Sequence, residues 1–75
     1  MRNLGLTPRE RATARCLLEG WDRNEIARQL RVAPGTIKRF STSVYNKTGQ
    51  DDQVGLIAFL LWNPWALAQV MECDL

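Results

Sequence analysis

The chain has 75 residues, of which 45% are apolar and 24% are charged, and its formal net charge is +2. A chain of this length folds as one domain with a small core, which excludes a multi-domain enzyme with a separate cofactor domain. The charge is unevenly placed. Residues 1–50 carry all ten Lys and Arg residues and four acids, a net charge of +6, whereas residues 51–75 carry four acids and no base, a net charge of −4. This split predicts one surface that faces a polyanion and a second surface with a different task.

The residues that catalysis and metal binding need are scarce. The sequence has no His, which is the commonest general base and metal ligand, and Cys16 and Cys73 lack the close spacing of a zinc site. It also lacks the glycine-rich phosphate loops and nucleophile motifs of common enzymes. We therefore expect no enzyme activity, no metal and no cofactor. Residues 1–5 do not begin a signal peptide, which favours a cytoplasmic protein and a small, buried Cys16 rather than a disulfide.

The first predicted helix has a strong start signal. Thr7 and Glu10 have the spacing of a capping box, and Pro8 fits the first helical position between them. The helix is predicted to reach Leu18. Gly20 then supplies the left-handed residue that commonly ends a helix.

A second, shorter helix repeats this pattern, with Asp22 and Glu25 as its capping box. The side chains that its spacing turns inward are Ile26, Ala27 and Leu30. Residues 31–35 then form a tight turn, in which Val32 reaches the core and Pro34 starts the next helix.

The third predicted helix, at about 34–48, has two contrasting faces. At about 100° per residue, one side collects the core residues Ile37, Phe40, Ser41, Val44 and Thr48. The opposite side collects Arg39, Thr42 and Asn46, with Lys38 and Ser43 on the flanks. Gly49 ends the helix. A helix with a core face and a basic outer face of short side chains suits the major groove of DNA.

The rest of the chain is predicted to be helical and mostly apolar. Asp51 and Asp52 offer an N-cap for a fourth helix at about 53–62, and Asn63-Pro64 then breaks the pattern. A short fifth helix or a kinked extension follows. No segment has the alternation of a strand, so the expected fold is all-α.

Two short helices around a tight turn, the second with a basic outer face, are typical of a helix-turn-helix. Here the sequence resembles the LuxR/GerE-type helix-turn-helix family, without a gap over about residues 6–57. The segments that carry the resemblance are Leu6-Thr7-Pro8-Arg9-Glu10-Arg11, Gly20, Asn24-Glu25-Ile26-Ala27-Arg28-Gln29-Leu30, Gly35-Thr36-Ile37-Lys38, Tyr45-Asn46-Lys47 and Gly49. In length the chain is similar to the stand-alone, GerE-like members of the family.

The predicted elements and the resemblance together give an expected all-α fold with three parts. These are an N-terminal arm at 1–5, a four-helix LuxR-type helix-turn-helix domain at 6–62, and a short extra C-terminal helix at 63–75. Within the domain the resemblance implies a recognition helix at about 34–48 and a dimerisation helix at about 53–62. It further implies a bacterial transcriptional regulator that binds double-stranded DNA as a homodimer.

The resemblance also assigns contacts to individual residues. Base reading falls to Lys38, Arg39 and Thr42. Contacts with the DNA backbone fall to Arg23, Asn24, Thr36, Asn46 and Lys47. One departure from the family is Ala33, which stands where the family usually has a Ser cap, at a cost of roughly 1 kcal/mol.

Residues 53–71 form nineteen positions without a charge, nearly the length of a membrane-spanning helix. Gln53, Gln69 and the Asn63-Pro64 break interrupt the run, so membrane insertion is disfavoured. A domain this small is not expected to bury all of its large apolar side chains, and an exposed apolar patch marks a binding surface. The expected interface residues are Leu56, Phe59, Leu60, Trp62, Trp65 and Leu67.

Two hypotheses for this surface stay open. In the first, the surface forms a homodimer and the chain is a DNA-binding regulator. In the second, the chain is a small antagonist or partner module that forms a heterodimer with a LuxR-type regulator, or binds another protein, through its apolar C-terminal helices. The first makes activity depend on Lys38 and Thr42, and the second makes it depend on Trp62 and Trp65.

Overall fold

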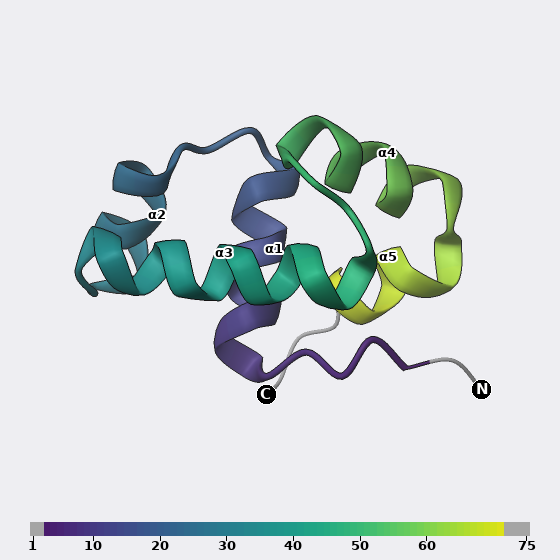
Figure 1. The fold of residues 1–75 in the computed structure, drawn as a ribbon, viewed down its shortest axis with the longest axis horizontal. Helices are drawn as coiled ribbons and strands as arrows, with labels where there is room; N and C mark the ends of the chain where they lie inside the picture. The colour runs from purple at the N-terminus through teal and green to yellow at the C-terminus, as the bar shows by residue number, and fades with distance from the viewer. Residues whose placement is uncertain (1–2, 72–75) are drawn as a thin grey trace.

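The computed structural model describes residues 3–71, which form five α-helices and no strand (Figure 1). The helices are α1 (Pro8–Leu18), α2 (Arg23–Leu30), α3 (Pro34–Thr48), α4 (Gln53–Trp62) and α5 (Pro64–Met71). The all-α prediction is confirmed, and each helix lies where the sequence pattern predicts it. The predicted helix within 63–75 is described as far as Met71, and Cys73 lies outside the described residues.

Both capping boxes predicted from the sequence are present. The Glu10 amide donates to Thr7 Oγ1 at 3.2 Å, and the Thr7 amide donates to Glu10 Oε1 at 2.9 Å. Asp22 and Glu25 exchange the same two bonds, at 2.8 and 3.1 Å. Each box satisfies amide groups that the first helical turn leaves without a partner. These four side chains therefore define where α1 and α2 begin.

Left-handed residues follow the first three helices. Gly20 has a φ of +88° and Gly49 a φ of +72°, as their predicted roles require. Between α2 and α3 the left-handed residue is Arg31, with a φ of +59°, a conformation that costs a side-chain-bearing residue about 1 kcal/mol. The next residue, Val32, packs against the core as predicted, so the tight turn is anchored from inside.

Helix α1 runs through the middle of the fold and contacts all four other helices. In Figure 1, α2 lies on one side of α1 and α4 and α5 lie on the other, while α3 crosses α1 from the α2 side towards α5. Ile26 of α2 and Ile37 and Val44 of α3 are fully buried, as are Leu56 and Leu60 of α4. Because α2 and α3 share this core, their outer sides form one surface of fixed shape.

The packing of the C-terminal helices shows that part of the predicted interface is wrong. Helices α4 and α5 bend by 110° at the break between them, so α5 packs against both α1 and α4. Leu56 and Leu60, which were expected in an exposed interface, are fully buried with Ala66 and Val70. The chain buries these side chains itself because the bend brings the two helices and α1 together.

Other members of the expected interface divide between the core and the surface. Trp62 is 84% exposed, next to Leu61 at 62%. Phe59, Trp65 and Leu67 are half-buried, and the Phe59 and Trp65 rings meet edge to face with their centroids 6.1 Å apart. Within residues 3–71 no single helix is long and apolar enough to cross a bilayer, although α4 and α5 together reach that length and hydropathy across their bend.

Candidate nucleic-acid interface

The outer face of α3 carries a row of polar and basic side chains. Lys38, Arg39, Thr42 and Asn46 are all exposed, whereas the opposite face supplies core residues such as Ile37. The Thr42 hydroxyl donates to the Lys38 carbonyl at 2.9 Å, which restrains the Thr42 rotamer. The four exposed residues also line a shallow hollow on this face. This row, called the α3 row below, presents hydrogen-bond donors, acceptors and positive charge on one rigid helix.

A second hollow, of about 320 Å³, opens between the start of α2 and the middle of α3. Lys38 and Thr42 of the α3 row line it, as do Arg23 and the half-buried side chains Trp21 and Tyr45. The sequence predicts only packing for Trp21, and the helical projection of α3 assigns Tyr45 to neither face. Neither signal shows that the α1–α2 connection approaches the middle of α3. The hollow joins the first turn of α2 to the α3 row.

A third hollow, of about 470 Å³, lies at the turn between α2 and α3. Asn24, Arg28 and Arg31 line it, together with Pro34 at the start of α3. The N-cap residue Ala33 makes no side-chain hydrogen bond, and the first turn of α3 contains no acid. No acid in the first turn of α3 itself therefore offsets the positive end of its dipole, and the two arginines add to it.

The predicted DNA-backbone residues do not all lie together. Arg23, Asn24 and Asn46 are exposed and border the hollows described above. Thr36 is half-buried in the first turn of α3 and lines a separate hollow with Arg39. The structure thus brings α2 and the α3 row into one surface and leaves Thr36 at its edge.

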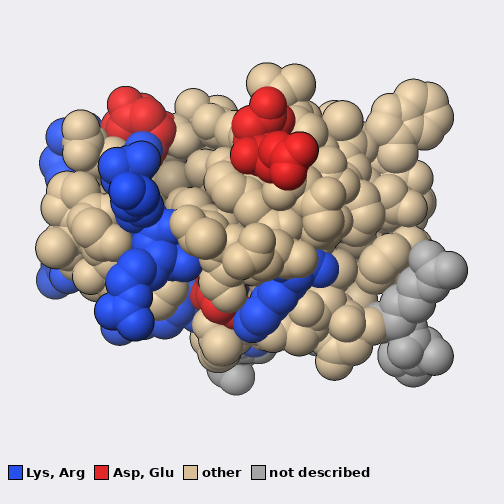
Figure 2. Space-filling model, viewed as in Figure 1, with Lys and Arg blue, Asp and Glu red and all other residues tan. Residues whose placement is uncertain are grey.

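Figure 2 shows how charge is distributed on one face of the molecule. Lys and Arg side chains gather over α2 and the first half of α3. The surface over α4 and α5 in this view carries no basic group, and an acidic patch lies beside the start of α4. On this face, most of the basic surface therefore lies away from α4 and α5, although acidic groups also lie beside α2 and one basic group lies along the second half of α3.

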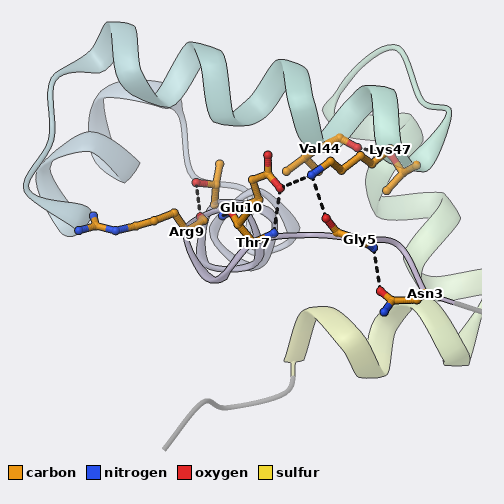
Figure 3. Close-up of polar contacts among 9 residues, drawn as sticks. Asn3, Gly5, Thr7, Arg9, Glu10, Val44 and Lys47 are labelled. Carbon is orange, nitrogen blue, oxygen red and sulfur yellow. Dashed lines mark hydrogen bonds and ion pairs between the residues drawn. The ribbon is translucent and has the colours of Figure 1, made fainter.

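Lys47 lies apart from the α3 row and is engaged by its own chain. Its ammonium lies 2.7 Å from Glu10 Oε1 and donates to the Gly5 carbonyl at 2.8 Å (Figure 3). The Lys47 side chain is 34% exposed and that of Glu10 only 9%. The resemblance implies a DNA-backbone contact for Lys47. In the structure these contacts hold α3 against α1 and the N-terminal segment, and the DNA-backbone contact stays a prediction.

The environment of Glu10 favours the ionised carboxylate that the contact with Lys47 needs. Burial by itself would raise the pKa of the carboxyl group. Hydrogen bonds from Lys47, Ser43 and the backbone of Thr7, together with the positive charge of Lys47, outweigh burial and lower the pKa from 4.5 to about 2. Glu10 is therefore ionised whenever the protein is near neutral pH.

The described residues offer little for catalysis or metal binding. Within residues 3–71, no group of three or more His, Cys, Asp or Glu residues could hold a metal ion. Cys16 is a half-buried free thiol, and burial and then the charge of Glu19 raise its pKa. Burial and the charge of Asp52 likewise raise the pKa of Tyr45. Both groups are thus held in their protonated forms at neutral pH, which does not favour a role as nucleophile or base.

The helix-turn-helix of α2 and α3, supported by α1 and α4, is also the part of the chain that matches a known family. The model of the GerE domain, described as bacterial regulatory proteins of the luxR family, matches residues 4–60. The chain belongs to the LuxR family. The family's domains are DNA-binding regulators rather than enzymes, so this chain carries a DNA-binding helix-turn-helix. The match ends within α4, and α5 lies beyond it. Searches of curated proteins and of solved structures each found no match to the chain.

Proposed function

We propose that this LuxR-family chain is a sequence-specific regulator of transcription that binds double-stranded DNA as a homodimer in the bacterial cytoplasm. The observation that carries the proposal is the α3 row, in which Lys38, Arg39 and Thr42 are exposed on a helix whose other face is fixed in the core. The major groove admits one α-helix, and guanine presents two acceptors there to Lys and Arg. The short Thr42 side chain lets the helix approach the base edges.

The surroundings of the α3 row support contact with the DNA backbone. Arg23 and Asn24 lie in the first turn of α2, beside hollows that open towards the α3 row and the start of α3. Helix N-termini and cations both attract phosphate groups. These contacts position the protein on the duplex, while the α3 row selects the sequence.

A second copy of the chain is the partner that the exposed surface of α4 favours. Leu61 and Trp62 are exposed there, and neither α4 nor α5 contains a charged residue. A two-fold dimer brings the same patch of each copy together, so an uncharged patch can pair with itself without charge repulsion. In Figure 1, α2 and α4 lie on opposite sides of α1, so pairing through the exposed side of α4 leaves both α3 rows free.

Selection of bound fragments from a random double-stranded DNA library tests this function. We expect an inverted repeat whose half-sites lie about one helical turn, or about 10 base pairs, apart. Lys38→Ala and Thr42→Ala should each reduce the preference for the selected sequence over a scrambled one. Arg9→Ala, which removes one exposed positive charge from α1, is the control and should keep that preference. Failure to enrich any sequence would exclude the proposal.

The exposure of Trp62 also favours a second candidate, an antagonist that forms a heterodimer with another LuxR-type regulator. This function needs the α4 surface and does not need the α3 row. Addition of the chain to a full-length LuxR-type regulator would then inhibit DNA binding by that regulator. Trp62→Ser should remove the inhibition and Lys38→Ala should keep it, which is the reverse of the pattern expected for a DNA-binding homodimer.

A further inference from the structure

The N-terminal segment, residues 3–6, lies between α5 and the C-terminal end of α3. The Leu4 amide donates to Oε1 of Gln69 in α5 at 2.8 Å. One residue later, the Gly5 carbonyl accepts from the ammonium of Lys47 in α3 at 2.8 Å (Figure 3). Two adjacent residues thus connect helices that lie far apart in the sequence.

The conformation of this segment is held in three further ways. Gly5 has a φ of +73°, a left-handed backbone that glycine adopts without steric cost. Its amide donates to Asn3 Oδ1 at 2.8 Å, which closes the turn locally. Leu4 and Leu6 pack against the core on either side of it. The segment is therefore a built connection rather than a loose arm.

The same ammonium that holds Gly5 also holds Glu10. Lys47 Nζ lies 2.7 Å from Glu10 Oε1, and that oxygen also accepts the Thr7 amide in the capping box of α1. Hydrogen bonds between ionised groups are stronger than those between neutral groups. A continuous chain of contacts consequently runs from Gln69 through residues 4 and 5 to Lys47 and the start of α1.

We propose that α5 positions α3 for DNA binding through this chain of contacts, with Gln69 and Lys47 as the positioning residues. This inference rests on the proposed DNA-binding function. Helix α5 lies beyond the region that matches the family, so the contact from Gln69 is a feature of this chain outside the matched domain. Gln69 holds Leu4, the held segment presents the Gly5 carbonyl to Lys47, and Lys47 fixes the C-terminal end of the helix that carries the α3 row.

A double-mutant cycle on DNA affinity tests the connection. Gln69→Met removes the acceptor of the Leu4 amide while keeping a side chain of similar length. We expect it to weaken binding to the selected DNA by about threefold to tenfold, the effect of losing about one net hydrogen bond from the binding-competent arrangement. In a Lys47→Met background the same change should weaken binding by less than about twofold, because the connection is already broken. Circular dichroism verifies that each variant is folded at the temperature of the assay.

The salt dependence of binding separates positioning by Lys47 from direct contact with phosphate. If Lys47 positions α3, Lys47→Met lowers affinity but leaves the slope of log K against log salt unchanged, and Lys47→Arg restores affinity. If it contacts a phosphate, the slope decreases in magnitude by about 0.9. Glu10→Gln combined with Lys47→Met avoids an unpaired buried carboxylate and serves as the folded variant should Lys47→Met unfold.

The outcomes are distinguishable. Absence of DNA binding by the unaltered chain overturns the proposed function and this inference with it. Normal DNA binding by a folded Gln69→Met variant overturns this inference alone. Equal effects of Gln69→Met in the two backgrounds also overturn it, because they show that Gln69 and Lys47 act independently. A reduced salt slope for Lys47→Met overturns it as well, because it shows that Lys47 contacts the DNA.

Discussion

The ammonium group of Lys47 lies 2.7 Å from the carboxylate of Glu10, although 37 positions separate the two residues in the sequence. The contact joins the last turn of α3 to the first turn of α1. Burial alone would raise the pKa of Glu10, but this contact, together with hydrogen bonds from Ser43 and the Thr7 backbone, lowers it from 4.5 to about 2. A lowered pKa in the folded state means that the ionised carboxylate stabilises the fold.

This shift predicts a specific loss of stability in acid. The contribution of Glu10 is complete above the unfolded-state pKa of about 4.5 and disappears as the pH falls through about 2. We expect the free energy of unfolding to fall by on the order of 2 kcal/mol from this group between about pH 5 and pH 2. Urea denaturation at several pH values measures it. Glu10→Gln should remove this part of the pH dependence, and matching profiles for variant and unaltered chain would contradict the account.

Substitution of Trp65 should lower monomer stability, whereas substitution of Trp62 should affect self-association. Trp65 is half-buried against Phe59, so Trp65→Ala should destabilise the monomer by about 2 kcal/mol through lost packing. Trp62 is 84% exposed, so Trp62→Ser should change monomer stability by less than about 0.5 kcal/mol. Trp62→Ser should instead abolish self-association.

Two measurements check this pair. Urea denaturation at a protein concentration below the dimer dissociation constant reports monomer stability, and sedimentation equilibrium reports self-association. A stable dimer formed by the Trp62→Ser variant would remove Trp62 from the proposed interface. A larger loss of monomer stability for Trp62→Ser than for Trp65→Ala would contradict the burial on which the assignment depends.

The start of α3 can be stabilised by one substitution. Ala33 occupies the N-cap with φ −70° and ψ 146°, the backbone of a capping residue, but it has no side-chain acceptor. Ala33→Ser should raise the free energy of unfolding by about 1 kcal/mol, because its hydroxyl can accept an amide of the first turn. Ala33→Val, which adds a side chain without an acceptor, is the control. Equal stability of the Ser and Val variants in urea would show that capping is not the cause.

Arg23 should affect DNA affinity without affecting sequence preference. It lies exposed in the first turn of α2, beside the hollow that borders the α3 row. We expect Arg23→Met to weaken binding to selected and scrambled DNA equally and to reduce the salt slope by about 0.9, since one phosphate contact is lost. Fluorescence anisotropy over a range of salt concentrations measures both effects. An unchanged slope would place Arg23 away from the backbone.

Local signals in the sequence predict much of the fold. The capping boxes at Thr7 and Asp22 and the left-handed Gly49 involve residues close in sequence, so pattern alone locates these helix ends. The exposure of Lys38 and Thr42 follows equally from the period of one helix. Each of these features depends on interactions within about one turn of the chain.

Sequence patterns do not reveal contacts that join distant segments. The burial of Leu60 depends on the 110° bend that packs α5 on α4 and α1. The engagement of Lys47 depends on Gly5 and Glu10, which lie 42 and 37 positions away. Helical periodicity carries no information about such angles and distances. For the same reason the link between Leu4 and Gln69 has no sequence signal.

The most direct test of the central claim is an NMR titration of the isotope-labelled chain with the selected DNA duplex. We expect the largest changes in chemical shift to map to the α3 row, Lys38, Arg39, Thr42 and Asn46, and to the first turn of α2. Changes confined to α4 and α5, with the α3 row unaffected, would contradict the account.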